Sequence, residues 1–214
     1  MRTFIALAWL ILPGLSAVAA AEPSTRIAWT PQTLNLVKSG DPARGQTKAA
    51  SCQGCHGAEP ANAATPFPYL NGQLATYLYR QLQDYKAGGR PHPIMTGIAA
   101  ALSDQDMADI AQWYSQQAPV QMPEGRGDVP RLVVDGDSKR LIAPCGICHG
   151  GHGQGEPVDT PRLSGQKASY LKETLLAYKS GQRHNDIYRR MRIMAERLSP
   201  EEIDVLGNYY GGLR

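Results

Sequence analysis

Several features common in other protein classes are scarce in this sequence. After the first 21 residues, no apolar run approaches the roughly 20 residues that a membrane-spanning helix needs. Basic residues number 22 and acidic residues 19, an excess too small to indicate a nucleic-acid partner. No segment shows the alternation of apolar and polar residues that is typical of strands. These absences favour a helical protein with no nucleic-acid partner and at most peripheral membrane association.

The first 21 residues have the pattern of a secretory leader. Met1-Arg2 is followed by an apolar run from Phe4 to Leu15 and then by small residues up to Ala21. A short basic start, an apolar core and an A-x-A-like end are typical of a cleaved signal peptide. An uncleaved membrane anchor is the alternative, but the run is short and Pro13-Gly14 interrupts it. We therefore predict cleavage after Ala21, with Ala19 as the second choice, and a periplasmic mature protein.

Cysteine is also rare, and its arrangement is the most informative feature of the chain. The four cysteines form two C-x-x-C-H motifs, Cys52 to His56 and Cys145 to His149. Four cysteines in an exported chain could form two disulfides, and a C-x-x-C pair could be a redox dithiol. The histidine directly after each pair is typical instead of covalent haem attachment. Two thiols on one helical turn reach both haem vinyl groups, and the next imidazole points at the iron. We predict two haem c groups, attached through Cys52, Cys55, Cys145 and Cys148, with His56 and His149 as iron ligands.

The chain repeats itself, and the repeat organises it into domains. An offset of 93 positions relates Cys52 to Cys145, and a later offset of 96 relates Met95 to Met191. The change of offset places a three-residue insertion of the second copy within residues 185–190. The segment from Ala118 to Pro130 is rich in Pro and Gly, as a linker would be. We predict a signal peptide over 1–21, an N-terminal extension over 22–39, a first domain over 40–117, a linker over 118–130 and a second domain over 131–214.

Apolar residues at helical spacing recur in both copies. Asp41 and Pro42 are typical of a helix N-cap and first residue, and Gly88 is typical of a helix end. The predicted helices cover residues 42–51, 73–86, 103–115, 166–179 and 199–210, and the third buries Met107, Ile110, Ala111 and Tyr114. Residues 22–39 lie outside the repeat and are either a strap across the two domains or a contact for a partner.

With these motifs the sequence resembles the class I cytochromes c and, within them, the tandem dihaem cytochromes c4. The resemblance covers nearly all of residues 40–214. It is carried by C-x-x-C-H, Pro-x-Leu-x-Gly-Gln-x-x-x-Tyr-Leu, Tyr-Lys-x-Gly-x-Arg, a methionine, and Leu-Ser before an aromatic helix, each present twice. The resemblance implies an all-α fold of two tandem class I cytochrome c domains, each enclosing one covalently bound haem. It also implies His/Met-ligated iron and a role in periplasmic electron transfer.

Methionine ligation has to be assigned among several candidates. The repeat selects Met95 and Met191, because each lies seven positions before its Leu-Ser pair. Methionine is more often a core residue than a ligand, an interpretation that suits Met107, Met122 and Met194. His92 and His184 stay open as alternative sixth ligands, which would lower the reduction potential.

The resemblance implies residues around the ligands as well. In the family, a proline twelve residues after the haem histidine offers its carbonyl to the other ring nitrogen, a role that falls on Pro68 and Pro161. Such a bond fixes the tautomer and orientation of the ligand. Gly72-Gln73 and Tyr77, with their equivalents in the second copy, are expected to line or cap the haem pocket.

The predicted ligands leave the iron without an open position. We therefore predict an electron carrier between respiratory-chain donors and acceptors, with no catalytic residues. Expected partners are redox proteins: a respiratory complex, a terminal oxidase, a copper protein or a dehydrogenase. An electron-transfer subunit of a dehydrogenase complex, of the flavocytochrome sulfide dehydrogenase type, is the main alternative, and a small dihaem peroxidase or thiosulfate dehydrogenase is another. The arginines around Met191 form either a solvated helix face or a docking rim for an acidic partner.

Overall fold

The structure, a computed structural model, describes residues 24–57, 65–120 and 128–213. All regular elements in these ranges are helices. The loops contain two isolated β-bridges, Asp137 with Ile142 and Glu156 with Thr160. No helix in the same ranges is long and apolar enough to cross a membrane. The prediction of a helical fold is confirmed, while the predicted signal peptide, Met122 and the middle of the predicted linker lie outside the described residues.

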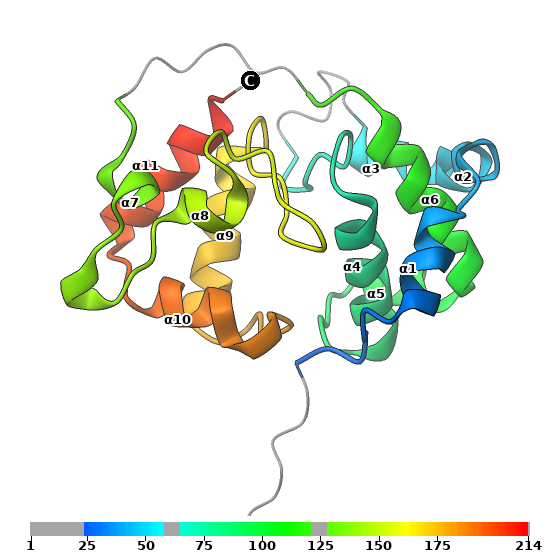
Figure 1. Cartoon of the computed structure of the whole chain (residues 1–214). Coiled ribbons are helices and arrows are strands. Elements are labelled where there is room, and N and C mark those ends of the chain that lie inside the picture. The colour runs from blue at the N-terminus through cyan, green and yellow to red at the C-terminus, as the bar shows by residue number, and fades with distance from the viewer. Residues whose placement is uncertain (1–23, 58–64, 121–127, 214) are drawn as a thin grey trace, which may run out of the picture.

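The helices form two groups, one from each sequence copy (Figure 1). The first group contains α1 (Pro31–Lys38), α2 (Pro42–Lys48), α3 (Gln53–His56), α4 (Ala75–Ala87), α5 (Met95–Ala100) and α6 (Asp104–Gln116). The second contains α7 (Arg131–Val134), α8 (Cys145–His149), α9 (Ala168–Lys179), α10 (Arg190–Glu196) and α11 (Pro200–Gly211). Short 3-10 turns lie at Ala49–Ser51, Ser138–Arg140 and Ile187–Arg189. In each group the C-terminal helix, α6 or α11, packs against the long middle helix, α4 or α9.

The five predicted helices are present, with their ends shifted by a few residues. Asp41 caps α2, because its carboxylate accepts hydrogen bonds from the backbone N–H groups of Ala43 and Arg44. Gly88, in the left-handed region at φ 79°, ends α4. Helices α1, α5, α7 and α10 were not predicted, since runs of 4 to 8 residues carry too little periodicity to be recognised.

Each group encloses its own apolar core. The first core is built largely by α6, whose predicted buried side is confirmed: Met107, Ile110, Ala111 and Tyr114 are all buried. Helix α1 packs on α6 and α4 and adds Val37 to this core. The second core lies between α9 and α11 and contains Leu171, Ile203, Leu206 and Tyr210. The two cores are separate, so the connection between the copies depends on other contacts.

Helices α2 and α6 can approach closely because Gly45 has no side chain where they cross. A Cβ atom at Gly45 would collide with the backbone carbonyl of Asp109 and lie 2.9 Å from Cβ of Trp113. The neighbouring Arg44 donates from Nε to the buried carboxylate of Asp109 at 2.7 Å. Only glycine permits this close approach of α2 and α6, and the ion pair between Arg44 and Asp109 lies next to it.

The Gly45→Ala substitution should destabilise the protein by about 2 kcal/mol, the usual size of an overpacking penalty. Urea unfolding followed by circular dichroism measures the change. Gly97→Ala in α5 is the matched control, because nothing lies within 4 Å of the added Cβ atom and alanine favours a helix. Equal stability of Gly45→Ala and the wild type would show that the contact at Gly45 does not limit how closely α2 and α6 pack.

Asp106 anchors the start of α6. Its carboxylate accepts from the backbone N–H of Ser103 at 3.0 Å and lies 2.9 Å from Nζ of Lys48 on α2. The bond from Lys48, followed by those from Ser103, lowers the pKa of Asp106 from 3.8 to about 2. A carboxyl group whose pKa is lowered by folding stabilises the folded state above its unfolded pKa. That contribution is lost as the pH falls through the pKa of the folded state.

Replacing Asp106 with Asn should lower the free energy of unfolding at neutral pH by about 1 kcal/mol, the typical value of a helix cap. The difference from the wild type should shrink below pH 3.8 and vanish only below the folded-state pKa of about 2. Denaturant titrations at a series of pH values test this. Asp104→Asn, in the same helical turn, controls for the helix dipole. A destabilisation by Asp106→Asn that is independent of pH would contradict the assignment.

Candidate functional site

The two C-x-x-C-H motifs fold into equivalent positions. In the first copy the motif spans Cys52 and α3, and in the second it coincides with α8. In both, the first cysteine is half-buried, the second is exposed and the histidine is buried. None of the four cysteines forms a disulfide. Each copy therefore holds two free thiols and one imidazole on a single helical turn, which is the donor set that covalent haem attachment needs.

Each motif histidine lies against a proline carbonyl twelve residues further along the chain. Nδ1 of His56 is 2.9 Å from the carbonyl oxygen of Pro68, and Nδ1 of His149 is 2.9 Å from that of Pro161. When Nδ1–H donates to this oxygen, Nε2 keeps its lone pair for a metal ion. Burial lowers the pKa of both histidines, and the proline carbonyl opposes this only in part. The neutral imidazole that a metal requires is therefore the favoured form.

A buried tyrosine from the last helix of each copy lies near the first cysteine. Tyr114 and Tyr210 are repeat equivalents, and each packs edge-on against the aromatic ring before it, at 4.5 and 5.1 Å. Their hydroxyl groups are buried and have no hydrogen-bond partner among the described residues. Burial, followed by the charge of Cys52 or Cys145, raises the pKa of both phenols. Two unpaired hydroxyls in equivalent places fit a prosthetic group beside the cysteines of each copy.

The two predicted methionines lie on equivalent short helices. Met95 is the first residue of α5 and Met191 the second of α10, and both are half-buried. Met194 packs against the second core. His92 accepts at Nδ1 from the backbone N–H groups of Ile94 and Met95, at 3.2 Å each. The equivalence of Met95 and Met191 in the sequence thus has a counterpart in space, and His92 orders the turn before Met95.

The arginines near Met191 are largely neutralised within the protein. Arg189 forms an ion pair with Glu196 at 2.9 Å, and Arg192 with the buried Asp186 at 2.7 Å. Arg190 lies 3.6 Å from the carboxylate of Asp159. These pairs favour a helix face with internal charge balance over a docking rim for an acidic partner.

The three-residue insertion of the second copy connects the two copies. Asn185 is fully buried and donates from Nδ2 to Gln81 at 3.0 Å and to Asp84 at 2.7 Å, both on α4. Arg80, also on α4, donates to the carbonyl of Asn185 at 2.8 Å and lies 3.0 Å from the carboxylate of Asp159. The sequence indicates the insertion only as a change of offset. Its role was missed because its partners lie 101 to 105 positions away.

Equivalent arginines exchange tyrosine partners between the copies. Arg90 donates to the hydroxyl of Tyr170 at 3.1 Å, and Arg183 donates to the hydroxyl of Tyr77 at 3.0 Å. Each arginine also lies over a tyrosine ring of its own copy at 4.7 Å. Tyr77 was expected to line or cap a haem pocket, which stays a prediction, and its hydroxyl accepts a bond from the other copy. The contact is symmetric, so the two copies face each other with the same surface.

The N-terminal extension crosses this junction. Ser24 donates to the carbonyl of Asp186 at 2.9 Å, and Nε1 of Trp29 donates to the carboxylate of Asp159 at 3.1 Å. Both acceptors belong to the second copy, whereas α1 of the same extension packs on α6 of the first. Of the two roles left open by the sequence, these contacts support the strap.

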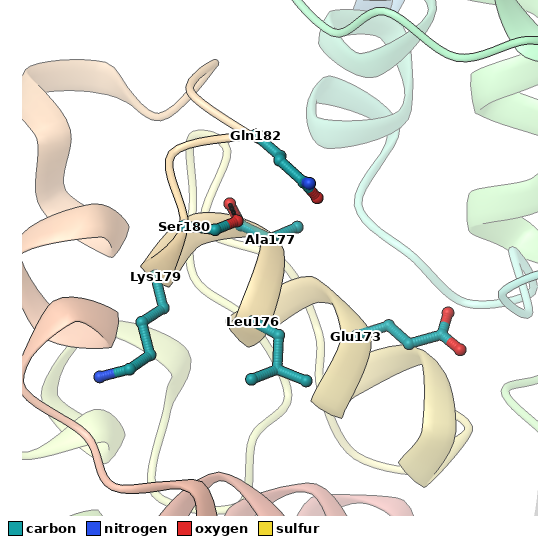
Figure 2. A pocket seen from close by; sticks show the side chains of 6 residues that line it. All are labelled: Glu173, Leu176, Ala177, Lys179, Ser180 and Gln182. Atoms are coloured by element: carbon teal, nitrogen blue, oxygen red, sulfur yellow. Dashed lines mark hydrogen bonds between the residues drawn. The ribbon is translucent and has the colours of Figure 1, made fainter.

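A shallow hollow on α9 is a second place where a ligand could bind. It is lined by Glu173, Leu176, Ala177, Lys179, Ser180 and Gln182 (Figure 2). The polar ends of Glu173 and Lys179 point in different directions (Figure 2), so they do not converge on one point. The lining contains no cysteine, histidine or methionine, and the hollow offers no catalytic arrangement.

Comparison with known proteins agrees with this geometry. The profile of the Cytochrome c family matches residues 42–117. The chain is 38% identical over 193 residues to cytochrome c4 of Azotobacter vinelandii, covering 82% of this chain and 90% of that protein. It is 37% identical over 172 residues to the thiosulfate dehydrogenase electron acceptor of Stutzerimonas stutzeri (strain A1501), covering 77% and 80%. The crystal structure of reduced recombinant cytochrome c4 from Pseudomonas stutzeri matches with a TM-score of 0.75 and 36% identity, over 82% of this chain and 100% of that one. The prediction of a class I cytochrome c fold is confirmed.

Proposed function

The chain belongs to the cytochrome c4 family and is a c-type cytochrome that carries electrons, and we propose that it is a periplasmic carrier with two haems. One haem c belongs to each of two domains, residues 40–117 and residues 131–214. The observation that carries the proposal is the repeated His–Pro geometry. In both copies a buried C-x-x-C-H histidine lies 2.9 Å from a proline carbonyl through Nδ1, with Nε2 available for iron.

Each domain supplies two covalent anchors and one fixed ligand. Haem c, when bound, supplies an iron that gains or loses one electron at a time. The cysteine thiols add to the haem vinyl groups as thioethers, so the group cannot dissociate from an exported protein. These anchors are Cys52, Cys55, Cys145 and Cys148. The iron ligands His56 and His149 bind through Nε2, while the carbonyls of Pro68 and Pro161 fix their tautomer and ring orientation.

Met95 and Met191 complete the coordination in this proposal. Their equivalent places at the start of α5 and α10 support the assignment, and a thioether ligand raises the reduction potential relative to a second histidine. His92 orders the backbone at Met95 through Nδ1 rather than binding iron. With a histidine and a methionine as ligands, each iron would have no position for a substrate, which suits electron transfer rather than catalysis.

The partners are redox proteins, which the chain meets either as a free carrier or as an electron acceptor beside a dehydrogenase. The leader-like residues 1–21 support a periplasmic site, where a respiratory complex, a terminal oxidase, a copper protein or a dehydrogenase could exchange electrons with a free carrier. The similarity to a thiosulfate dehydrogenase electron acceptor favours, as a second candidate, an electron-accepting role beside a dehydrogenase. In both arrangements the chain transfers electrons and the partner performs the chemistry.

Ligation by methionine can be tested with two neighbouring residues. Met191→Ala should remove about half of the far-red methionine-to-iron charge-transfer absorption of the oxidised protein, because one of two equivalent irons loses its thioether. Met194→Ala should keep this absorption and instead lower the stability by about 2 kcal/mol, since the half-buried Met194 packs against the second core. Absorption spectroscopy and denaturant unfolding measure the two effects. Loss of the band in Met194→Ala alone would reverse the assignment.

The free-carrier proposal predicts how the protein purifies. Native extraction followed by size-exclusion chromatography should yield most of the haem absorbance at the size of the single chain, in fractions that accept and donate electrons without a bound dehydrogenase. Constant co-elution with a flavoprotein or a thiosulfate-oxidising activity would favour the complex-subunit alternative over the free carrier.

A further inference from the structure

Two glutamines, one in each copy, pair with the backbone of the other copy. Gln166 accepts at Oε1 from the backbone N–H of Tyr69 at 2.9 Å and donates from Nε2 to the carbonyl of Tyr69 at 2.8 Å. Gln73 makes the same two bonds to Arg162, at 2.8 and 3.0 Å. An offset of 93 positions relates Gln73 to Gln166 and also Tyr69 to Arg162. The two pairings are therefore one contact, made twice by the internal symmetry of the protein.

The amide that each glutamine holds is the one that contacts the haem-motif histidine. The N–H of Tyr69 and the carbonyl of Pro68 belong to the same peptide group. That carbonyl lies 2.9 Å from Nδ1 of His56. In the second copy the N–H of Arg162 and the carbonyl of Pro161 are likewise one peptide group, and this carbonyl lies 2.9 Å from Nδ1 of His149. One planar amide thus connects a glutamine of one domain to a histidine of the other.

We propose that Gln166 is a positioning residue for His56, and Gln73 for His149, so that each domain tunes the axial histidine of its neighbour. The inference rests on the proposed ligation of iron by these histidines. The proposed role needs no open coordination site on the iron. It gives Gln73 a function in addition to the expected one of lining the haem pocket of its own domain.

Polarisation of the shared amide determines in which direction the glutamine changes the reduction potential of the haem. A bond accepted from the N–H of Tyr69 shifts electron density towards the carbonyl oxygen of Pro68, because hydrogen bonds in a chain strengthen one another. A stronger acceptor draws the Nδ1 proton of His56 and makes the ring a more basic ligand. A more basic ligand stabilises the oxidised iron and lowers the reduction potential of that haem.

The glutamine–backbone hydrogen bonds lie in a largely buried place between the domains. Gln73, Gln166 and Tyr69 are only 6–7% exposed and Arg162 is half-buried, so water has little access to these bonds. Both glutamines and both loop residues, Tyr69 and Arg162, border one small cavity between the domains. Each glutamine Oε1 also accepts from the next backbone N–H, at 3.0 Å, which holds the side-chain amide in place. The pairing is therefore held in place and present only while the two domains are docked.

The test is a pair of reciprocal substitutions in the full-length holoprotein. Gln166→Leu, which removes the acceptor at similar size, should raise the potential of the haem bound by His56 (haem 1) and leave that of the haem bound by His149 (haem 2) unchanged. Gln73→Leu should raise the potential of haem 2 alone. We expect a change on the order of threefold in the reduction equilibrium, or about 28 mV at about 59 mV per tenfold. Haem methyl resonances followed by NMR through a redox titration report the two haems separately.

A ligand-centred signal separates positioning from general loosening of the interface. In the reduced protein, Gln166→Leu should move the Nδ1 proton resonance of His56 upfield, as expected for a weaker hydrogen bond, and leave that of His149 in place. Asn185→Ala, which removes interdomain bonds to α4 but none to either loop, is the matched control and should change neither resonance. A shift in the domain that carries the substitution, or equal shifts in both haems, would overturn the proposal.

Wild-type hydrogen exchange keeps the inference testable if a leucine variant does not assemble. The amides of Tyr69 and Arg162 should exchange as slowly as those in the middle of α6, and fast exchange of either would overturn the pairing. Failure of the ligation itself gives a different result. Wild-type protein would then show no ring N–H resonance shifted by a haem at His56 or His149, whatever the behaviour of the glutamine variants.

Discussion

The hydrogen bond between a buried histidine and a proline carbonyl is the contact on which the rest of this molecule depends. It occurs at 2.9 Å in both copies, and it commits one ring nitrogen so that the other can bind a metal. The bond requires the loop that carries the proline to return over the C-x-x-C-H helix. Residues 68–69 and 161–162 are thereby brought to the surface where the copies meet, and the same loops that orient the histidines become part of the domain contact.

The domain contact is polar, and most of its buried groups are paired or hydrogen-bonded. Arg80, Asp84 and Asp159 are each less than 7% exposed, and charges removed from water to this degree destabilise a fold unless they are paired and hydrogen-bonded. The insertion at Asn185 provides several of those bonds, and the strap from Ser24 to Trp29 closes the junction from outside. A network of this kind allows little sliding, since any displacement leaves buried groups without partners. The two domains are consequently held in one relative orientation.

A fixed orientation suits a protein that transfers electrons without performing chemistry. The chain folds the C-x-x-C-H motif and its proline carbonyl into equivalent positions twice. What differs between the halves is their environment: charged residues surround Met191, whereas Pro93, Ile94, Thr96 and Gly97 flank Met95. In the glutamine pairing the halves also act on each other. Docking and redox properties are then two consequences of the same few hydrogen bonds.

The sequence by itself determined the features that depend on near neighbours or on comparison of its two copies. The haem motifs, five helices with their caps and the buried side of α6 follow from spacing within one or two turns, and the two tandem copies follow from the 93-residue offset. The class I cytochrome c fold was implied by the resemblance that these motifs carry. The domain boundaries, the haem-binding residues and the methionine assignment stay predictions on the same basis. Only the tertiary structure decided the interdomain contacts of Gln73, Tyr77, Asn185 and the N-terminal strap. Their partners lie far away in the chain, and no local pattern encodes which surface a buried polar side chain meets once the domains dock.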